Sequence, residues 1–214
     1  LYFRYLLLYK STPTLVGLDS AITLLKASNR MYLEEQDAKK KTEFCEDLQV
    51  CGEEFSTLIQ ARELELVELC KLGKTEEQLN WFVQKYAESI HQRAAYQYLT
   101  KFAFDEALKI NTESAYRSFA TRYEKSEEFK FALDSLESIS FRSVVRENSA
   151  SKYKLFLGEY PQSKRYSIVR AKMWQKAFEE AEQLNTKTAY VDFVASFPTS
   201  DLVPKAKIAM EKLD

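Results

Sequence analysis

The chain has little glycine, proline, histidine or cysteine, and each shortage excludes a class of protein. Its 214 residues include 4 Gly, 4 Pro, 1 His and 3 Cys. So few turn-forming residues do not suit an all-β protein, which needs a tight turn after every short strand. One histidine and three cysteines without metal-ligand spacing do not make a zinc site. There is no Gly-rich phosphate loop and no Gly-x-Ser-x-Gly motif, so we expect no cofactor and no metal.

The three cysteines are Cys45, Cys51 and Cys70. An odd number without ligand spacing favours three buried or half-buried thiols. A disulfide between Cys45 and Cys51 is the alternative.

The chain also lacks a long apolar run and an excess of charge of one sign. No apolar stretch approaches the roughly 20 residues that span a bilayer, so we expect no membrane span in this segment. The apolar start, residues 1–9, is interrupted by Arg4 and is not followed by a small-residue cleavage site, which argues against a signal peptide. The net charge of −1 provides no general attraction for nucleic acid, and no nucleic-acid partner is expected.

What the chain does have is an aromatic motif, Tyr-x-x-Phe-x-x-x-Tyr-x-x-Ser, that returns every 37 residues. A period of this length is typical of stacked supersecondary units. Three copies begin at Tyr116, Tyr153 and Tyr190, and an earlier copy begins at Leu79. Apolar or small residues at offsets 0, 3, 4 and 7 predict one face of a first helix, and those at offsets 16, 20 and 23 predict a second. Each unit is therefore expected to be a helical hairpin.

Residues that start and end helices stand at the same spacing. A hydroxyl residue precedes each aromatic helix, where it can accept from the unpaired N–H groups of the first turn. These expected caps are Thr75, Thr112, Ser149 and Thr186. An asparagine, which tolerates the left-handed conformation that ends many helices, precedes three of the caps. These are Asn111, Asn148 and Asn185.

The first third of the chain is less regular. The same offsets fit its beginning, so we interpret residues 1–28 as a hairpin whose cap would lie before residue 1, and we expect the chain to begin inside a longer protein. Between residues 29 and 73 the period is lost, and an irregular pair of long helices is expected, Arg30–Val50 and Glu53–Leu72, separated near Gly52. Residues 74–214 are expected to hold four repeats. All three regions together predict one continuous all-α solenoid of antiparallel helical hairpins.

The spacing of the motif resembles the tetratricopeptide repeat, whose unit has about 34 residues. The segment from Asn185 to Ser200 reads Asn-Thr-x-x-Ala-Tyr-x-x-Phe-Val-x-x-Phe-Pro-x-Ser. It is similar to tetratricopeptide-like repeats of bacterial envelope proteins, including outer-membrane assembly lipoproteins and periplasmic coordinators of cell division. The chain departs from the family where Val83 and Leu157 replace its usual small residue, and it lacks the terminal proline. The resemblance covers residues 75–214 and implies a right-handed α-solenoid.

The resemblance also implies a function. Tetratricopeptide-like proteins bind a peptide or a partner helix in a concave groove lined by their first helices. We therefore expect a non-catalytic protein–protein interaction scaffold in a bacterial cell-envelope complex, in the periplasm and associated with the outer membrane. The region upstream of residue 1 could carry a membrane anchor. The alternative is an architectural spacer in a larger multidomain protein, without a ligand of its own.

In such an array the residues that do not repeat are the ones expected to contact a partner. On the first helices these candidates are Arg117, Arg122, Lys154, Glu159 and Asp192. Arg117 and Lys154 stand at equivalent positions one repeat apart, so they predict a basic ladder for an acidic peptide.

Residues that could serve catalysis have simpler explanations. His91 begins an expected second helix without a nearby catalytic partner in the sequence, which favours a surface or capping role. The carboxylates Glu179, Glu180 and Glu182 are expected to lie on a solvated helix face. The repeated tyrosines are explained by packing between helices. We predict no catalytic residue and no enzyme.

Overall fold

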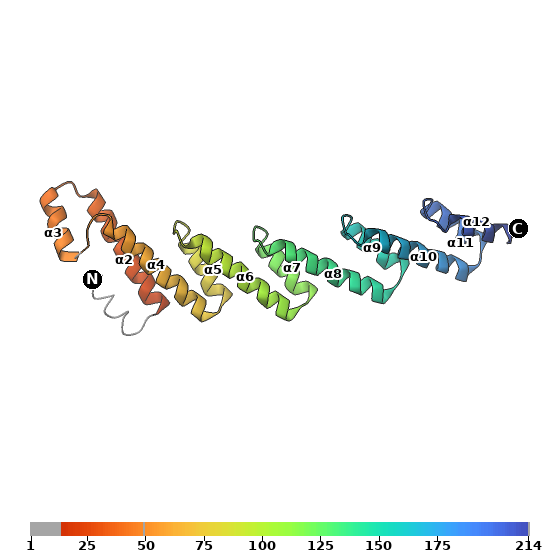
Figure 1. The fold of residues 1–214 in the computed structure, drawn as a ribbon, viewed down its shortest axis with the longest axis horizontal. Coiled ribbons are helices and arrows are strands. Elements are labelled where there is room, and N and C mark those ends of the chain that lie inside the picture. Colours follow the sequence, from red (N-terminus) through yellow and green to blue (C-terminus); the bar gives the residue numbers. More distant parts are fainter. Residues whose placement is uncertain (1–13, 49, 214) are drawn as a thin grey trace. The chain divides into compact units, whose positions relative to one another are not determined.

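The computed structural model describes residues 14–48 and 50–213, and every regular element in these ranges is an α-helix. The all-α prediction is confirmed (Figure 1). The helices are α2 (Leu15–Glu34), α3 (Ala38–Leu48), α4 (Glu54–Gly73), α5 (Glu76–Lys85), α6 (Gln92–Ile110), α7 (Glu113–Arg122), α8 (Phe129–Glu147), α9 (Ala150–Glu159), α10 (Tyr166–Leu184), α11 (Lys187–Ser196) and α12 (Val203–Glu211). The chain divides into two compact units. The N-terminal unit holds the described residues up to 109 together with 125–128, and the C-terminal unit holds residues 110–124 and those from 129 onward.

Four short helices begin at the expected hydroxyl caps. α5, α7, α9 and α11 each have 10 residues and start directly after a Thr or Ser in extended conformation. The hydroxyl of each cap accepts from the backbone N–H three residues later, at 3.3–3.4 Å. The predicted caps are Thr75, Thr112, Ser149 and Thr186, and all four are confirmed. Each stabilises its helix by about 1 kcal/mol.

The expected asparagine helix ends are also present. Asn111, Asn148 and Asn185 have φ between 45° and 50°, the left-handed conformation that stops a helix. Lys74 takes the same conformation after α4. The side chains of two of the asparagines also accept a hydrogen bond from the first tyrosine of the next helix. Tyr116 donates to Asn111 at 3.2 Å, and Tyr153 donates to Asn148 at 2.9 Å.

In the C-terminal unit each helix from α7 to α12 packs on the next. The repeated aromatic side chains fill its core, each at most 4% exposed. They are Tyr116, Phe119, Tyr153, Phe156, Tyr190 and Phe193. Full burial of such a side chain is worth about 1.5–3 kcal/mol. Offset 16 of the motif is fully buried as Ala132, Val169 and Ala206.

The core role expected for offset 23 holds for Leu25, which is 1% exposed, but not in the C-terminal unit. Ile139 is only half-buried there and Leu213 is 40% exposed, and the copy that begins at Tyr153 already departs from the apolar pattern with Lys176. The helices α8 and α10 continue past this position, and their later residues make the contact instead. The Phe178 ring, for example, lies 5.4 Å from that of Phe193 on α11.

In the N-terminal unit α2 packs on α4, and α4 packs on α5. The expected core residues Leu18, Ile22 and Leu25 of α2 are buried. Phe55 and Leu66 of α4 are fully buried as well.

The helix expected over Arg30–Val50 is wrong. α2 continues to Glu34, and α3 begins only at Ala38. The break comes from two carboxylates. Glu35 accepts from the backbone N–H groups of residues 36 and 37, and Asp37 accepts from those of Lys39 and Lys40 in the first turn of α3. The break expected near Gly52 is present, and Gly52 itself has a φ of 49°. The first helix expected within residues 1–28 falls in the part outside the described residues.

The cysteine expectation is wrong for two of the three residues. Cys45 and Cys51 form a disulfide, with their Cα atoms 5.0 Å apart. It ties the end of α3 to the loop before α4, beside an aromatic cluster of Tyr32, Phe44 and Phe55. Cys70 is a buried free thiol, and burial raises its pKa to about 11.

Candidate functional site

Two of the five predicted contact residues are paired with each other. The guanidinium of Arg117 on α7 donates to Glu159 on α9 at 2.7 Å, and it also donates to Glu113 at 2.7 Å. These hydrogen bonds to Glu159 and Glu113 raise the pKa of Arg117. The three side chains are about half exposed, so water screens the pairs and weakens them. Arg117 is therefore balanced by two carboxylates.

The other three candidates lie on the same first helices of the C-terminal unit. Arg122 at the end of α7 donates to the carbonyl of Ser118 at 3.3 Å and lies over the Tyr123 ring at 5.3 Å. Lys154 on α9 and Asp192 on α11 are exposed. Of the two residues in the predicted basic ladder, Arg117 is therefore paired with carboxylates of the chain, and Lys154 is exposed to solvent.

A surface groove that the sequence did not single out lies in the N-terminal unit, between the start of α2 and α5. It has a volume of about 480 Å³, and we call it the Trp81 groove. Its lining includes Leu15, Val16, Asp19, Glu77, Trp81 and Lys85. Val16 is 77% exposed. An apolar floor containing a half-buried tryptophan, with charges at its edge, is the usual composition of a protein-binding hot spot.

The wall of the Trp81 groove is fixed by hydrogen bonds between helices. Asp19 on α2 accepts from the Tyr86 hydroxyl at 2.7 Å and from the Lys85 ammonium at 2.7 Å. Burial, and then the hydrogen bond to Asp19, raise the pKa of Tyr86. Lys85 in turn lies 5.3 Å from the Trp81 ring. Lys85 thus contacts both Asp19 and the Trp81 ring at this wall.

The same network extends into the interior of the N-terminal unit. The Lys26 ammonium lies 2.6 Å from a carboxylate oxygen of Glu63 on α4 and 4.9 Å from the centre of the Tyr86 ring. Glu63 is 3% exposed, and a carboxylate buried without such a partner would be costly. Three helices, α2, α4 and α5, are thus joined by charged and polar contacts as well as by apolar packing. We call Asp19, Lys26, Glu63, Lys85 and Tyr86 the polar junction.

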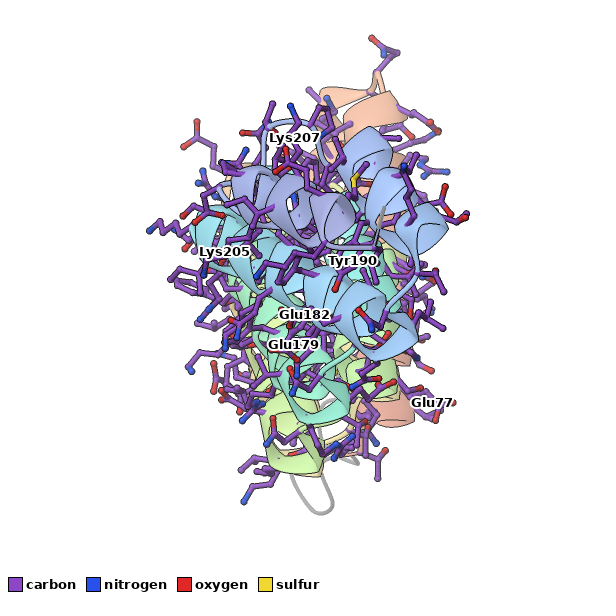
Figure 2. All side chains as sticks on the ribbon, turned by 90° about the vertical axis from the view of Figure 1, so that its right-hand side faces the viewer. Glu77, Glu179, Glu182, Tyr190, Lys205 and Lys207 are labelled. Carbon is purple, nitrogen blue, oxygen red and sulfur yellow. A yellow bond between two sulfur atoms is a disulfide. The ribbon has the colours of Figure 1, made fainter. Side chains whose placement is uncertain are left out.

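His91 and Glu179 make contacts within the chain. The Nε2 atom of His91 is 3.0 Å from the carbonyl oxygen of Gln60 on α4. Glu179 accepts from Gln175 and from Lys176, and the Lys176 hydrogen bond lowers its pKa. Glu179 and Glu182 both lie on α10, below Tyr190 of α11 in the view of Figure 2.

Two further kinds of site are absent from the described residues. In residues 14–48 and 50–213, no three His, Cys, Asp or Glu side chains are grouped to hold a metal ion. No helix in that part of the chain combines the length and apolar character that crossing a bilayer requires.

Sequence reasoning missed the Trp81 groove for an identifiable reason. Trp81 stands between repeated residues at a position that does not repeat, where the later copies have Ser118, Leu155 and Asp192. That departure was a usable signal. The other wall of the groove is α2, which contributes Val16 and Asp19. These residues lie more than 60 positions before Trp81 and are not part of the motif.

Comparisons of the chain with protein-family models, with curated proteins and with solved structures found no match.

Proposed function

We propose that this chain is a non-catalytic scaffold that binds another protein, and that the Trp81 groove receives an apolar side chain of that partner. In this proposal residues 74–214 are tetratricopeptide-like helical hairpins with a 37-residue period, and the chain forms a right-handed solenoid. The spacing of the four hydroxyl caps and of the left-handed asparagines supports the repeat.

The observation that carries the proposal is the half-buried Trp81 in a preformed apolar groove. A tryptophan that water reaches contributes little to folding at its open face, but it offers a large apolar surface to a partner. Because the polar junction holds Lys85 and Asp19 at the groove wall, binding would require little rearrangement. Preorganised anchors of this kind lower the entropic cost of association.

The charge at the groove favours a partner segment with a basic residue beside its apolar anchor. Asp19 and Lys85 neutralise each other. Glu77, in the first turn of α5, is exposed and adds a negative charge at the edge. A Lys or Arg next to the anchor would meet this carboxylate and orient the segment in the groove.

The compartment proposed from the resemblance is the bacterial periplasm, in association with the outer membrane. The Cys45–Cys51 disulfide supports an oxidising compartment, because such bonds persist outside the reducing cytosol.

A photo-crosslinking experiment tests the proposal. Benzoylphenylalanine is placed at Val16, inside the groove, and in a second protein at Leu155, which is 65% exposed in the C-terminal unit. Leu155 stands at the motif position of Trp81, two repeats later. A synthetic peptide covering the segment crosslinked at Val16 is then titrated against the wild-type chain, Trp81→Ala and Leu155→Ala.

The expected result is a crosslink that depends on the Val16 position and a peptide whose Kd rises about thirtyfold or more in Trp81→Ala, as for a hot-spot residue. Leu155→Ala should bind like the wild type. Equal crosslinking at both positions, or an unchanged Kd in Trp81→Ala at normal helicity, would rule out the groove. If neither position crosslinks to any protein, the spacer role becomes the better explanation.

A further inference from the structure

A second hollow, in the N-terminal unit, contains polar atoms that lack partners. It has a volume of about 430 Å³ and lies between α6 and residues 125–128. Within the described residues, Ser126 Oγ and Glu128 Oε2 are buried and make no hydrogen bond. Unpaired buried groups of this kind are costly, and the cost is larger for a charged oxygen. We call this hollow the Glu128 hollow.

An equivalent hollow in the C-terminal unit shows how the chain can provide hydrogen-bond partners for the polar atoms at this position. It has a volume of about 520 Å³ and includes Glu137 and Arg165 in its lining. There the Ser163 hydroxyl donates to Glu137 at 2.9 Å, the Arg165 guanidinium donates to the same oxygen at 2.6 Å, and the Arg165 backbone N–H donates to Ser163 at 2.9 Å. The guanidinium also lies 5.1 Å from the Phe141 ring. Every group named here has a partner from within the chain.

Matching the two hollows position by position shows what the first one lacks. Ser126 corresponds to Ser163, Thr100 to Glu137, and Glu128 to Arg165, each 37 residues apart. In the Glu128 hollow the carboxylate stands at the position of Arg165, and a threonine stands at the position of Glu137. None of the three matched positions in this hollow carries an arginine. Thr100 is 1% exposed, and its hydroxyl already donates to the carbonyl of Gln97 at 3.2 Å. The missing component is a cationic donor that hydrogen-bonds to Glu128 Oε2 and Ser126 Oγ.

We propose that the Glu128 hollow binds an arginine side chain of a partner protein, which takes the place that Arg165 fills in the other hollow. A planar guanidinium carries enough N–H groups to serve Glu128 Oε2 and Ser126 Oγ at once. The ring of Tyr96 lines the hollow and offers a face for stacking, as Phe141 does for Arg165. This inference rests on the proposed function as a protein-binding scaffold and names the chemistry of the partner.

The other charges of the hollow refine the ligand. Arg93, Lys101, Lys125 and Glu127 also line it, and all four are exposed. Lys101 pairs with Asp105 at 3.2 Å. Exposed charges are screened, whereas the Glu128 oxygen is buried and acts at short range. The three cations at the edge favour an arginine that has acidic neighbours in the partner sequence.

The test uses blocked tripeptides and the intact chain. Acetyl-Glu-Arg-Glu-amide is titrated into the isotopically labelled protein, and amide shifts near Tyr96, Ser126 and Glu128 are followed by NMR. The control peptide replaces arginine with citrulline, which has the same shape without the positive charge. The arginine peptide should bind about tenfold or more tightly, because a charged hydrogen bond is lost in the control. If the citrulline peptide binds as well or better, the basic edge governs recognition and the proposal is wrong.

The second part of the test measures binding of the arginine peptide to variants of the Glu128 hollow. Glu128→Gln keeps the size of the side chain and should weaken the arginine peptide by about tenfold or more. Glu124→Gln removes an exposed carboxylate outside the hollow and should leave binding unchanged. Equal losses in both variants, or no saturable shift in the wild type, would overturn the proposal. The second outcome would mean that ordered water satisfies Ser126 and Glu128.

A third variant rebuilds the pair that the C-terminal unit contains. Thr100→Glu with Glu128→Arg should fill the hollow from within, abolish peptide binding and keep or raise the Tm. Retained binding in this variant, with unchanged helicity, would count against the site. Trp81→Ala should not change arginine-peptide binding, so a failure here can be told apart from a failure of the Trp81 groove.

Discussion

Tyr86 in the N-terminal unit and Tyr160 and Phe197 in the C-terminal unit occupy the same position of the motif, yet their surroundings differ. Each ring packs on the phenylalanine four residues earlier, with centroids 4.9–5.5 Å apart. Tyr86 is 4% exposed, and its hydroxyl donates to Asp19. Tyr160 is half-buried and donates to the exposed Glu159, and Phe197 has no hydroxyl. The apolar contact of this position is repeated, whereas the hydroxyl hydrogen bond of Tyr86 is buried and that of Tyr160 is exposed to water.

The difference shows how the irregular helices are attached to the repeats. In the C-terminal unit one hairpin meets the next through edge-on and tilted aromatic contacts, and its Arg117–Glu159 ion pair is half exposed. In the N-terminal unit α2 and α4 meet α5 through the polar junction, including the buried Glu63. Apolar packing tolerates small shifts between surfaces, whereas charged hydrogen bonds require particular partners at particular distances. We therefore expect the two units to respond differently to substitutions and to pH.

The largest effect is expected from truncating a repeated phenylalanine. Phe156→Ala and Phe82→Ala remove rings that are at most 1% exposed, and each should lower the free energy of unfolding by about 3–5 kcal/mol. Urea unfolding is followed by the fluorescence of Trp81 in the N-terminal unit and of Trp174 in the C-terminal unit, using variants that keep one tryptophan. Leu155→Ala, at an exposed site, should cost below about 0.5 kcal/mol. A negligible cost at Phe156 would mean that the repeat register is wrong.

The next effect separates the two units. Lys26→Met leaves Glu63 buried without its partner and should lower the free energy of unfolding by about 2–4 kcal/mol, the lower part of this range applying because Lys26 is 44% exposed. The loss should be seen by Trp81 fluorescence, because the polar junction lies in the N-terminal unit. The double variant Lys26→Met with Glu63→Met should recover most of it, since a matched apolar pair needs no charge partner.

The recovery is the decisive part of this prediction. If the double variant is as unstable as the single one, the cost comes from lost packing of the Lys26 stem and not from an unpaired Glu63. The exposed pair in the C-terminal unit, Lys152 with Glu147, should cost much less when Lys152 is changed to Met, because water screens both charges.

The hydroxyl of Tyr86 gives a smaller and pH-dependent effect. Tyr86→Phe should cost about 1.5–3 kcal/mol, as for a hydrogen bond to a charged group, and Tyr160→Phe below about 0.5 kcal/mol, because Tyr160 and its acceptor Glu159 are in contact with water. The folded chain keeps the proton on Tyr86 above the pH at which an unfolded tyrosine loses it, about 10. The unfolded chain then ionises first, so the stability that the hydroxyl contributes is complete below that pH and falls as pH rises above it. The measured gap between wild type and Tyr86→Phe should therefore narrow in alkaline urea titrations. A gap that stays constant to pH 11 would contradict this account.

Sequence reasoning succeeded where the structure is local. The hydroxyl caps and left-handed asparagines act within a few residues of themselves, so Thr112 and Asn148 could be assigned from spacing alone. It failed at the Arg30–Val50 helix, because a carboxylate such as Glu35 suits a helix interior as well as a helix end. The Asp19–Tyr86 hydrogen bond and the Ser126–Glu128 hollow depend on side chains brought together from distant segments. A periodic sequence pattern does not indicate contacts between distant segments. The candidate site could therefore be recognised only from the structure.

The smallest expected effect concerns the exposed charges that the sequence favoured as a binding ladder. Arg117→Ala removes contacts to Glu113 and Glu159 that are about half exposed, and it should change the free energy of unfolding by less than about 0.5 kcal/mol at physiological salt. The change should shrink further at high salt, because a Debye length of about 3 Å at 1 M screens these pairs. Lys26→Met, measured in the same salt series, should keep its cost because Glu63 is buried. If the two variants showed the same salt dependence, the contrast between a buried polar junction and a solvated charged surface would not hold.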